Sequence, residues 1–113
     1  MNNHNKAYNA YYQANAGINI KKNQKIVLEC KDPEVCFYFA KDIPGANIKA
    51  HEKILLELKH PKHSYFFARN IAGANIEEHF KVIFNSGNKF WLDRFIERVN
   101  YKNTKVEEWL LYI

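Results

Sequence analysis

The feature that most constrains the fold is a repeat of 28 residues, which runs through the chain without insertions or deletions. Asp32-Pro33 and His60-Pro61 lie 28 positions apart, and Gly-Ala-Asn-Ile occurs at 45–48 and again at 73–76. A fixed period of this kind is the signature of a protein built by stacking one small structural unit. We place the four repeats as follows: about 4–31, 32–59, 60–87 and 88–113.

Each repeat has the pattern of two helices joined by a short turn. In the second repeat Cys36, Phe39, Ala40 and Ile43 fall at i, i+3, i+4 and i+7, which is the apolar face of an amphipathic helix. Proline at the first helical position, in the Asp-Pro and His-Pro pairs, favours a helix start there. The glycines of the two Gly-Ala-Asn-Ile segments are expected to end the first helix as C-caps.

A recurring asparagine precedes the second helix of every repeat, and we predict that it caps that helix. The four asparagines are Asn19, Asn47, Asn75 and Asn103.

Three consecutive apolar positions recur in the second helix, at 26–28, 54–56 and 82–84. One helical hairpin cannot bury so wide a face, so the copies must stack on one another. The sequence therefore predicts an all-α fold, a short α-solenoid of about four helix-turn-helix repeats and about eight helices. We expect a single domain over 1–113 and fraying of the polar residues 1–6.

Composition restricts the function further. The net charge of +5 suits an anionic partner, either a nucleic acid or an acidic protein surface. No apolar run is long enough to cross a bilayer or to act as a signal peptide, so a cytoplasmic location is predicted. Cys30 and Cys36 occupy core-facing positions of the repeat and are expected to be small buried thiols.

No chemistry-bearing motif stands out from the repeat. His60 and His63 have a spacing that suits a metal, but no carboxylate or cysteine near them in sequence completes a site. His51 and His79 share one position of the repeat, which reflects duplication. Glycine-rich phosphate loops and catalytic triads are absent from the sequence. We therefore predict no metal, no cofactor and no enzymatic activity.

Surface residues are the remaining candidates. Aromatic side chains lie off the core face beside basic ones, which is the composition of protein-binding patches. We expect at least one aromatic residue of each adjacent pair to be buried by neighbouring repeats. The predicted partner-binding residues are Phe37, Tyr38, Lys41, Tyr65, Phe66, Arg69, Trp91 and Arg94, with the segment 88–91 before Arg94 as the most specific part. Lysines that share one position of the second helix are the candidates for anion binding: Lys25, Lys53 and Lys81.

Residues 39–48 and 67–76 resemble the short helical-hairpin repeats of bacterial and phage proteins. Small helical proteins of this type are similar to immunity proteins, which neutralise a toxin by binding it. The resemblance implies a non-catalytic inhibitor whose partner is a toxin or another effector domain. A helical repeat protein that binds nucleic acid, or a phage inhibitor of a nucleic-acid-dependent defence complex, is the alternative. The apolar residues 109–113 either fold over the last hairpin or join copies into a homo-oligomer.

Overall fold

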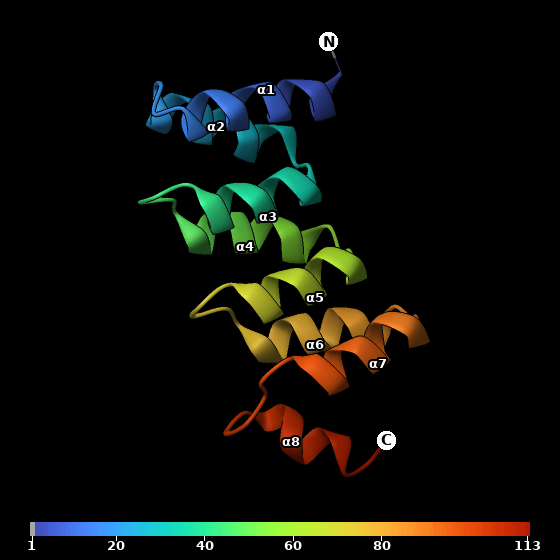
Figure 1. Cartoon of the computed structure of the whole chain (residues 1–113). Helices are drawn as coiled ribbons and strands as arrows, with labels where there is room; N and C mark the ends of the chain where they lie inside the picture. The colour runs from blue at the N-terminus through green and yellow to red at the C-terminus, as the bar shows by residue number, and fades with distance from the viewer. Residues whose placement is uncertain (1) are drawn as a thin grey trace. The chain divides into compact units, whose positions relative to one another are not determined.

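The computed structural model describes residues 2–113, and Met1 lies outside the described part. These residues form helices joined by short turns, without any strand between positions 2 and 113. In chain order the helices are α1 (Asn3–Asn15), α2 (Ile20–Cys30), α3 (Pro33–Asp42), α4 (Ile48–Glu57), α5 (Pro61–Asn70), α6 (Ile76–Asn85), α7 (Lys89–Arg98) and α8 (Lys105–Leu110). Figure 1 shows each repeat as one such pair of helices. The predicted all-α fold of helix-turn-helix repeats is confirmed.

The chain divides into two compact units, and the division falls between the second and third repeats. The first unit runs from Met1 to Leu58 and carries α1 to α4, while the second runs from Lys59 to Ile113 and carries α5 to α8. Within the first unit α1 packs on α2 and α3, and α3 packs on α4. Within the second, α5 packs on α6 and α7, and α6 also contacts α7 and α8. Each unit is thus a stack of two helical hairpins.

Residues 3–6 form the first turn of α1, although we expected residues 1–6 to fray. The side chain of Asn2 caps this turn by accepting a hydrogen bond from the backbone N–H of Asn5 at 2.8 Å. His4 Nδ1 lies 2.6 Å from Asp32 Oδ2, which connects the same turn to the start of α3. A capped helix end that also contacts a neighbouring helix is held where a purely polar terminus would fray.

The first helices of the second and fourth repeats begin at side-chain caps. Asp32 accepts from the backbone N–H of Val35 at 3.0 Å, and Pro33 follows as the first helical residue. Asn88 caps α7 in the same way, through the backbone N–H of Trp91 at 3.2 Å. These caps satisfy backbone donors that have no partner inside the helix.

Gly45 and Gly73, the glycines of the two Gly-Ala-Asn-Ile segments, do not act as helix C-caps, and that prediction is wrong. Helix α3 ends at Asp42, and the backbone N–H of Ala46 donates to the carbonyl of Ile43 at 3.1 Å. Gly45, with φ of +76°, is the third residue of the turn that this bond closes. Proline followed by a glycine of positive φ is the signature of a type II turn, and Pro44-Gly45 fits it. The helix therefore stops before its glycine, and the glycine reverses the chain.

The recurring asparagine caps two of the four second helices. Asn47 accepts from the N–H of Ala50 at 3.1 Å, and Asn75 accepts from that of Glu78 at 3.2 Å. Asn19 adopts a left-handed conformation and makes no side-chain cap, so the prediction is wrong there. It is also wrong at Asn103, which has positive φ and leaves the cap of α8 to Thr104. The end repeats have different turns, and in the last one a shift of one residue moves the cap to Thr104.

Each unit has its own apolar core, made by the predicted face of its first helices. In the first unit the buried side chains include Cys36, Phe39 and Ile43 from α3 and its end, packed with Val27 of α2. In the second unit Tyr65 and Phe95 pack with residues of α6 and α8. Full burial of one large apolar side chain contributes roughly 1.5–3 kcal/mol, so these faces hold the hairpins together. Cys30 and Cys36 are free, buried thiols, as predicted.

Candidate functional site

In the first unit, the predicted partner-binding residues of α3 separate into core and surface. Phe37 is only 5% exposed and belongs to the interior. Tyr38 is half-buried and Lys41 is exposed. The Lys41 Nζ lies 5.7 Å from the centroid of the Tyr38 ring and 3.2 Å from Asp42 Oδ1. Tyr38 and Lys41 therefore form a surface pair, whereas Phe37 cannot meet a partner directly.

Three tyrosines of α1 adjoin this pair, and we did not predict them as site residues. Tyr11 is only 9% exposed and belongs to the core of the first unit, so Tyr8 and Tyr12 are the two that reach the surface. Tyr8, Tyr11 and Tyr12 lie at i, i+3 and i+4, so all three project from one side of the helix. Together with Tyr38 and Asp42 they line a hollow of about 270 Å³. Tyr12 is 61% exposed, far more than the alanine at its position in the inner repeats. The sequence did contain a signal for this surface. In the first repeat Tyr8 and Tyr12 stand at positions where the inner repeats have small core residues.

In the second unit the pair Tyr65 and Phe66 separates in the same way. Tyr65 is 2% exposed, while its hydroxyl accepts a hydrogen bond from Arg69 Nη1 at 3.1 Å. Phe66 is half-buried, and the ring of Trp91 packs against both residues, with centroids 5.5 and 5.7 Å away. The prediction that one aromatic residue of each pair is buried is confirmed, by Phe37 and by Tyr65.

The segment singled out before Arg94 contributes the most exposed ring of α7. Phe90 is 54% exposed and meets Trp91 edge-on, with centroids 4.7 Å apart. The Arg94 guanidinium carbon lies 4.7 Å from the Phe90 centroid, in the range of a cation–π contact. Phe66, Phe90, Trp91 and Arg94 thus make a continuous aromatic and cationic surface on α5 and α7, which we call the α7 surface.

The three lysines of the shared position are all exposed, but their surroundings differ. Lys81 Nζ lies 3.2 Å from Glu78 Oε1 and 5.4 Å from the centroid of the Trp109 ring. Lys25 on α2 and Lys53 on α4 form no ion pair with any residue between 2 and 113. Only Lys25 and Lys53 therefore present an uncompensated charge.

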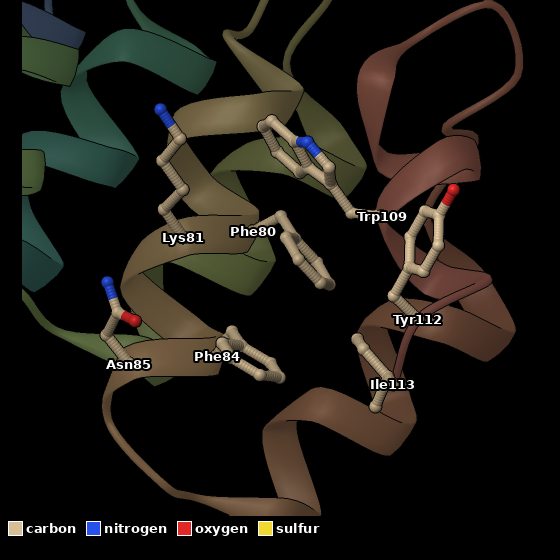
Figure 2. Close-up of a pocket in the computed structure, with 7 residues that line it drawn as sticks. All are labelled: Phe80, Lys81, Phe84, Asn85, Trp109, Tyr112 and Ile113. Carbon is tan, nitrogen blue, oxygen red and sulfur yellow. The ribbon is translucent and has the colours of Figure 1, made fainter.

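The apolar C-terminal residues lie against α6, in the hairpin that precedes their own. Figure 2 shows Trp109, Tyr112 and Ile113 opposite Phe80 and Phe84 of α6, around a groove of about 320 Å³. The Trp109 ring stacks on that of Phe80, with centroids 5.9 Å apart. Tyr112 and Ile113 remain largely exposed. The end of the chain thus covers part of α6 and leaves an open apolar groove beside it.

One histidine and two carboxylates lie close together in a group that the sequence did not reveal. The metal-ligating atoms of His4, Asp32 and Glu34 lie within 4.8 Å of one another, the one such group found among residues 2–113. His4 and Asp32 are already joined at 2.6 Å, which accounts for their proximity without an ion. His60 Nδ1 accepts from the backbone N–H of His63 at 3.4 Å, so His60 caps α5. The metal-like spacing of these two histidines is thus explained by the helix cap.

Among residues 2–113, no helix combines the length and the apolar character needed to span a membrane. The chain matches no protein-family model, no curated protein and no solved structure. Function therefore has to be argued from the surfaces themselves.

Proposed function

We propose that this protein is a non-catalytic, protein-binding inhibitor, and specifically an immunity protein that neutralises a cognate bacterial toxin or another effector domain by direct binding. The observation that carries the proposal is the α7 surface, where a largely exposed Phe90 and a half-buried Trp91 lie beside Arg94. Tryptophan, tyrosine and arginine are the residues in which the binding energy of protein interfaces concentrates.

The geometry of this surface favours a protein partner. Trp91 rests on Tyr65 and Phe66, so its ring is held in place before any partner arrives. A preorganised aromatic side chain loses little conformational entropy on binding, and the affinity gains accordingly. The Arg94 guanidinium lies against the Phe90 ring and still offers donors to a carboxylate. The net charge of +5 would attract a partner whose contact surface is acidic.

A nucleic-acid-binding protein is the second candidate, because Lys25 and Lys53 have no ion-pair partner among residues 2–113. Such lysines would contact phosphates, and the resulting affinity would fall steeply between low and physiological salt. A phage inhibitor of a nucleic-acid-dependent defence complex belongs to the same alternative.

Affinity capture from native lysate, with the full chain as bait, distinguishes the two candidates. The capture is run with and without nuclease, and a stoichiometric protein that survives nuclease supports the inhibitor. The captured protein is then assayed with and without the chain, because an inhibitor must reduce the activity of its partner. If capture disappears after nuclease treatment, the nucleic-acid-binding candidate is supported instead of the inhibitor.

A pair of variants then assigns the surface. Trp91→Ala should abolish or strongly weaken capture, since a central aromatic anchor is worth 2 kcal/mol or more, roughly a 30-fold change in affinity. Tyr112→Ala is the matched control, because Tyr112 is an exposed aromatic residue outside the α7 surface. Equal capture by the two variants would contradict the assignment of the α7 surface.

A further inference from the structure

A second aromatic surface, on the first unit, differs from the α7 surface in its charge. It consists of Tyr8, Tyr11, Tyr12 and Tyr38, which line the hollow of about 270 Å³ together with the carboxylate of Asp42. We call this group the tyrosine cluster. The hollow has room for one amino-acid side chain and is far from enclosing a drug-sized ligand. Its lining is aromatic rings and one acid, which is a cation-binding composition.

The rings of the tyrosine cluster are arranged closely enough to act together on one charge. The centroids of Tyr8, Tyr11 and Tyr38 form a nearly equilateral triangle with sides of 6.3, 6.5 and 6.2 Å. A point over the middle of this triangle lies within about 6 Å of all three centroids, and a cation there would be attracted by each ring that turns its face toward it. Tyr12 stands beside Tyr8 and Tyr11, at 5.7 and 5.4 Å, and forms an exposed wall.

Two carboxylates, Asp42 and Glu34, lie beside these rings, and Asp42 also forms an ion pair with Lys41 at the rim. Tyr11 Oη donates to Asp42 Oδ2 at 2.5 Å, and this hydrogen bond fixes one oxygen of the acid at the hollow. Burial and a hydrogen bond to Glu34 raise the pKa of Tyr8 above its ordinary value. Burial and the hydrogen bond to Asp42 do the same to the pKa of Tyr11. Both phenols therefore stay neutral, and the negative charge resides on the carboxylates.

The protein already places one of its own cations at the edge of this site. Lys41 Nζ lies 5.7 Å from the Tyr38 centroid and 3.2 Å from Asp42 Oδ1. The Lys41 side chain is 40% exposed and comes from the same helix as Tyr38, and it is at the rim because it does not line the hollow. The contact shows one cation beside a ring and the acid, held there by residues that are close to it in sequence. An ion pair at so exposed a position contributes little, and a better-fitting cation can replace it.

We propose that the tyrosine cluster is a receptor for an arginine side chain of the protein partner. A planar guanidinium stacks on an aromatic face and forms two parallel hydrogen bonds to a carboxylate, and a lysine ammonium can do neither. The proposal rests on the proposed function, since it names a chemical feature of the same partner. A basic chain can bind an arginine of its partner, because the net charge of the chain acts at long range whereas Asp42 acts locally at the hollow.

The test uses the intact chain and a blocked peptide, acetyl-Gly-Arg-Gly-amide, with the citrulline peptide as its neutral isostere. Tyrosine ring resonances are followed by NMR as each peptide is added, up to a concentration on the order of 10 mM, since an isolated contact of this kind is weak. The expected result is a saturable shift of the cluster resonances with arginine and none with citrulline. Equal shifts with the two peptides, or no saturable shift with arginine, would overturn the proposal.

Variants distinguish the site from general attraction to an acidic surface. Tyr12→Ala removes an exposed ring with no expected loss of folding, and it should weaken arginine binding about threefold to tenfold. Lys41→Gln should strengthen binding, because it frees Asp42 from its internal cation. Tyr112→Ala is the control and should change nothing. Binding that is unaltered by Tyr12→Ala and Lys41→Gln would contradict the site even if arginine is bound somewhere.

The two proposals fail in different ways. If the arginine peptide does not bind while lysate capture still depends on Trp91, the tyrosine cluster is not a receptor and the inhibitor proposal stands. If the peptide binds but no partner is captured, the site is real and the proposed function is the part that fails.

Discussion

The imidazole of His51 stacks on the ring of Phe39, with centroids 4.9 Å apart, inside the core of the first unit. His51 Nε2 lies 3.2 Å from Gln24 Oε1, so this nitrogen carries the proton and donates to the amide. The same oxygen accepts the backbone N–H of Asn47 at 2.7 Å. Gln24 thus connects α2 to the start of α4, and His51 completes the connection. No hydrogen-bond partner faces His51 Nδ1 within residues 2–113.

A pH-dependent stability follows from this environment. Burial lowers the pKa of His51 from its ordinary 6.5 to about 4. Below pH 6.5 His51 becomes protonated in the unfolded chain, whereas in the folded chain it is protonated only at about pH 4. Stability from His51 is therefore fully present above pH 6.5 and is lost as the pH falls toward 4, by about 3 kcal/mol in total. Urea denaturation at pH 7, 6 and 5 measures the loss.

Two variants test whether His51 causes that loss. His51→Gln cannot titrate in this range, so the decline in stability between pH 7 and pH 5 should become shallower. Phe39→Leu should lower stability at every pH and leave the decline in place, because it removes the stacked ring and keeps the buried imidazole. An unchanged decline in His51→Gln would assign the pH dependence to other groups.

The turn glycines should resist substitution for a conformational reason. A Cβ added at Gly45 would meet nothing within 4 Å, so no clash is involved. The positive φ of +76° nevertheless disfavours any L side chain. Gly45→Ala should therefore reduce the free energy of unfolding by about 1 kcal/mol, and Gly45→Asn by less, because asparagine tolerates this conformation. Thermal denaturation ranks the two variants, and an equal loss in both would contradict the explanation.

The C-terminal residues should contribute unequally to stability. Trp109 is half-buried and stacks on Phe80, so Trp109→Ala should cost about 2 kcal/mol. Deleting residues 111–113 should cost clearly less, since these side chains are mostly exposed. We also expect light scattering to give the mass of a single chain for both the full and the shortened protein. A mass that halves on deletion would show instead that this end joins two copies.

The nucleic-acid alternative makes its own prediction about the lysines. If the chain binds RNA or DNA, Lys25→Ala and Lys53→Ala should each reduce the slope of log affinity against log salt by about 1. Lys81→Ala should change it less, because Glu78 already lies 3.2 Å from that ammonium. Equal effects of the three substitutions would mean that the ion pair does not persist in solution.

Side chains brought together from separate repeats account for what the sequence did not reveal. The tyrosine cluster joins α1 to α3, and Tyr11 meets Asp42 across 31 positions. The group of His4, Asp32 and Glu34 likewise joins two helices. A period of 28 aligns equivalent positions, but it says nothing of which unlike positions meet across neighbouring helices. The repeat pattern also did not show which aromatic side chains are exposed, since Phe37 and Tyr38 are adjacent in sequence and differ in burial.

The sequence by itself determined the repeat, the helical class and the core face. These depend on local spacing, because apolar residues at i, i+3, i+4 and i+7 share a helix face in any fold. It also determined the starts of α3 and α5, where Asp-Pro and His-Pro fix the first turn. Only the tertiary structure decided that Phe37 is interior, that Lys81 is paired with Glu78, and that four tyrosines and Asp42 line one hollow. Each of these depends on distances between side chains, which helix packing sets and sequence spacing alone does not.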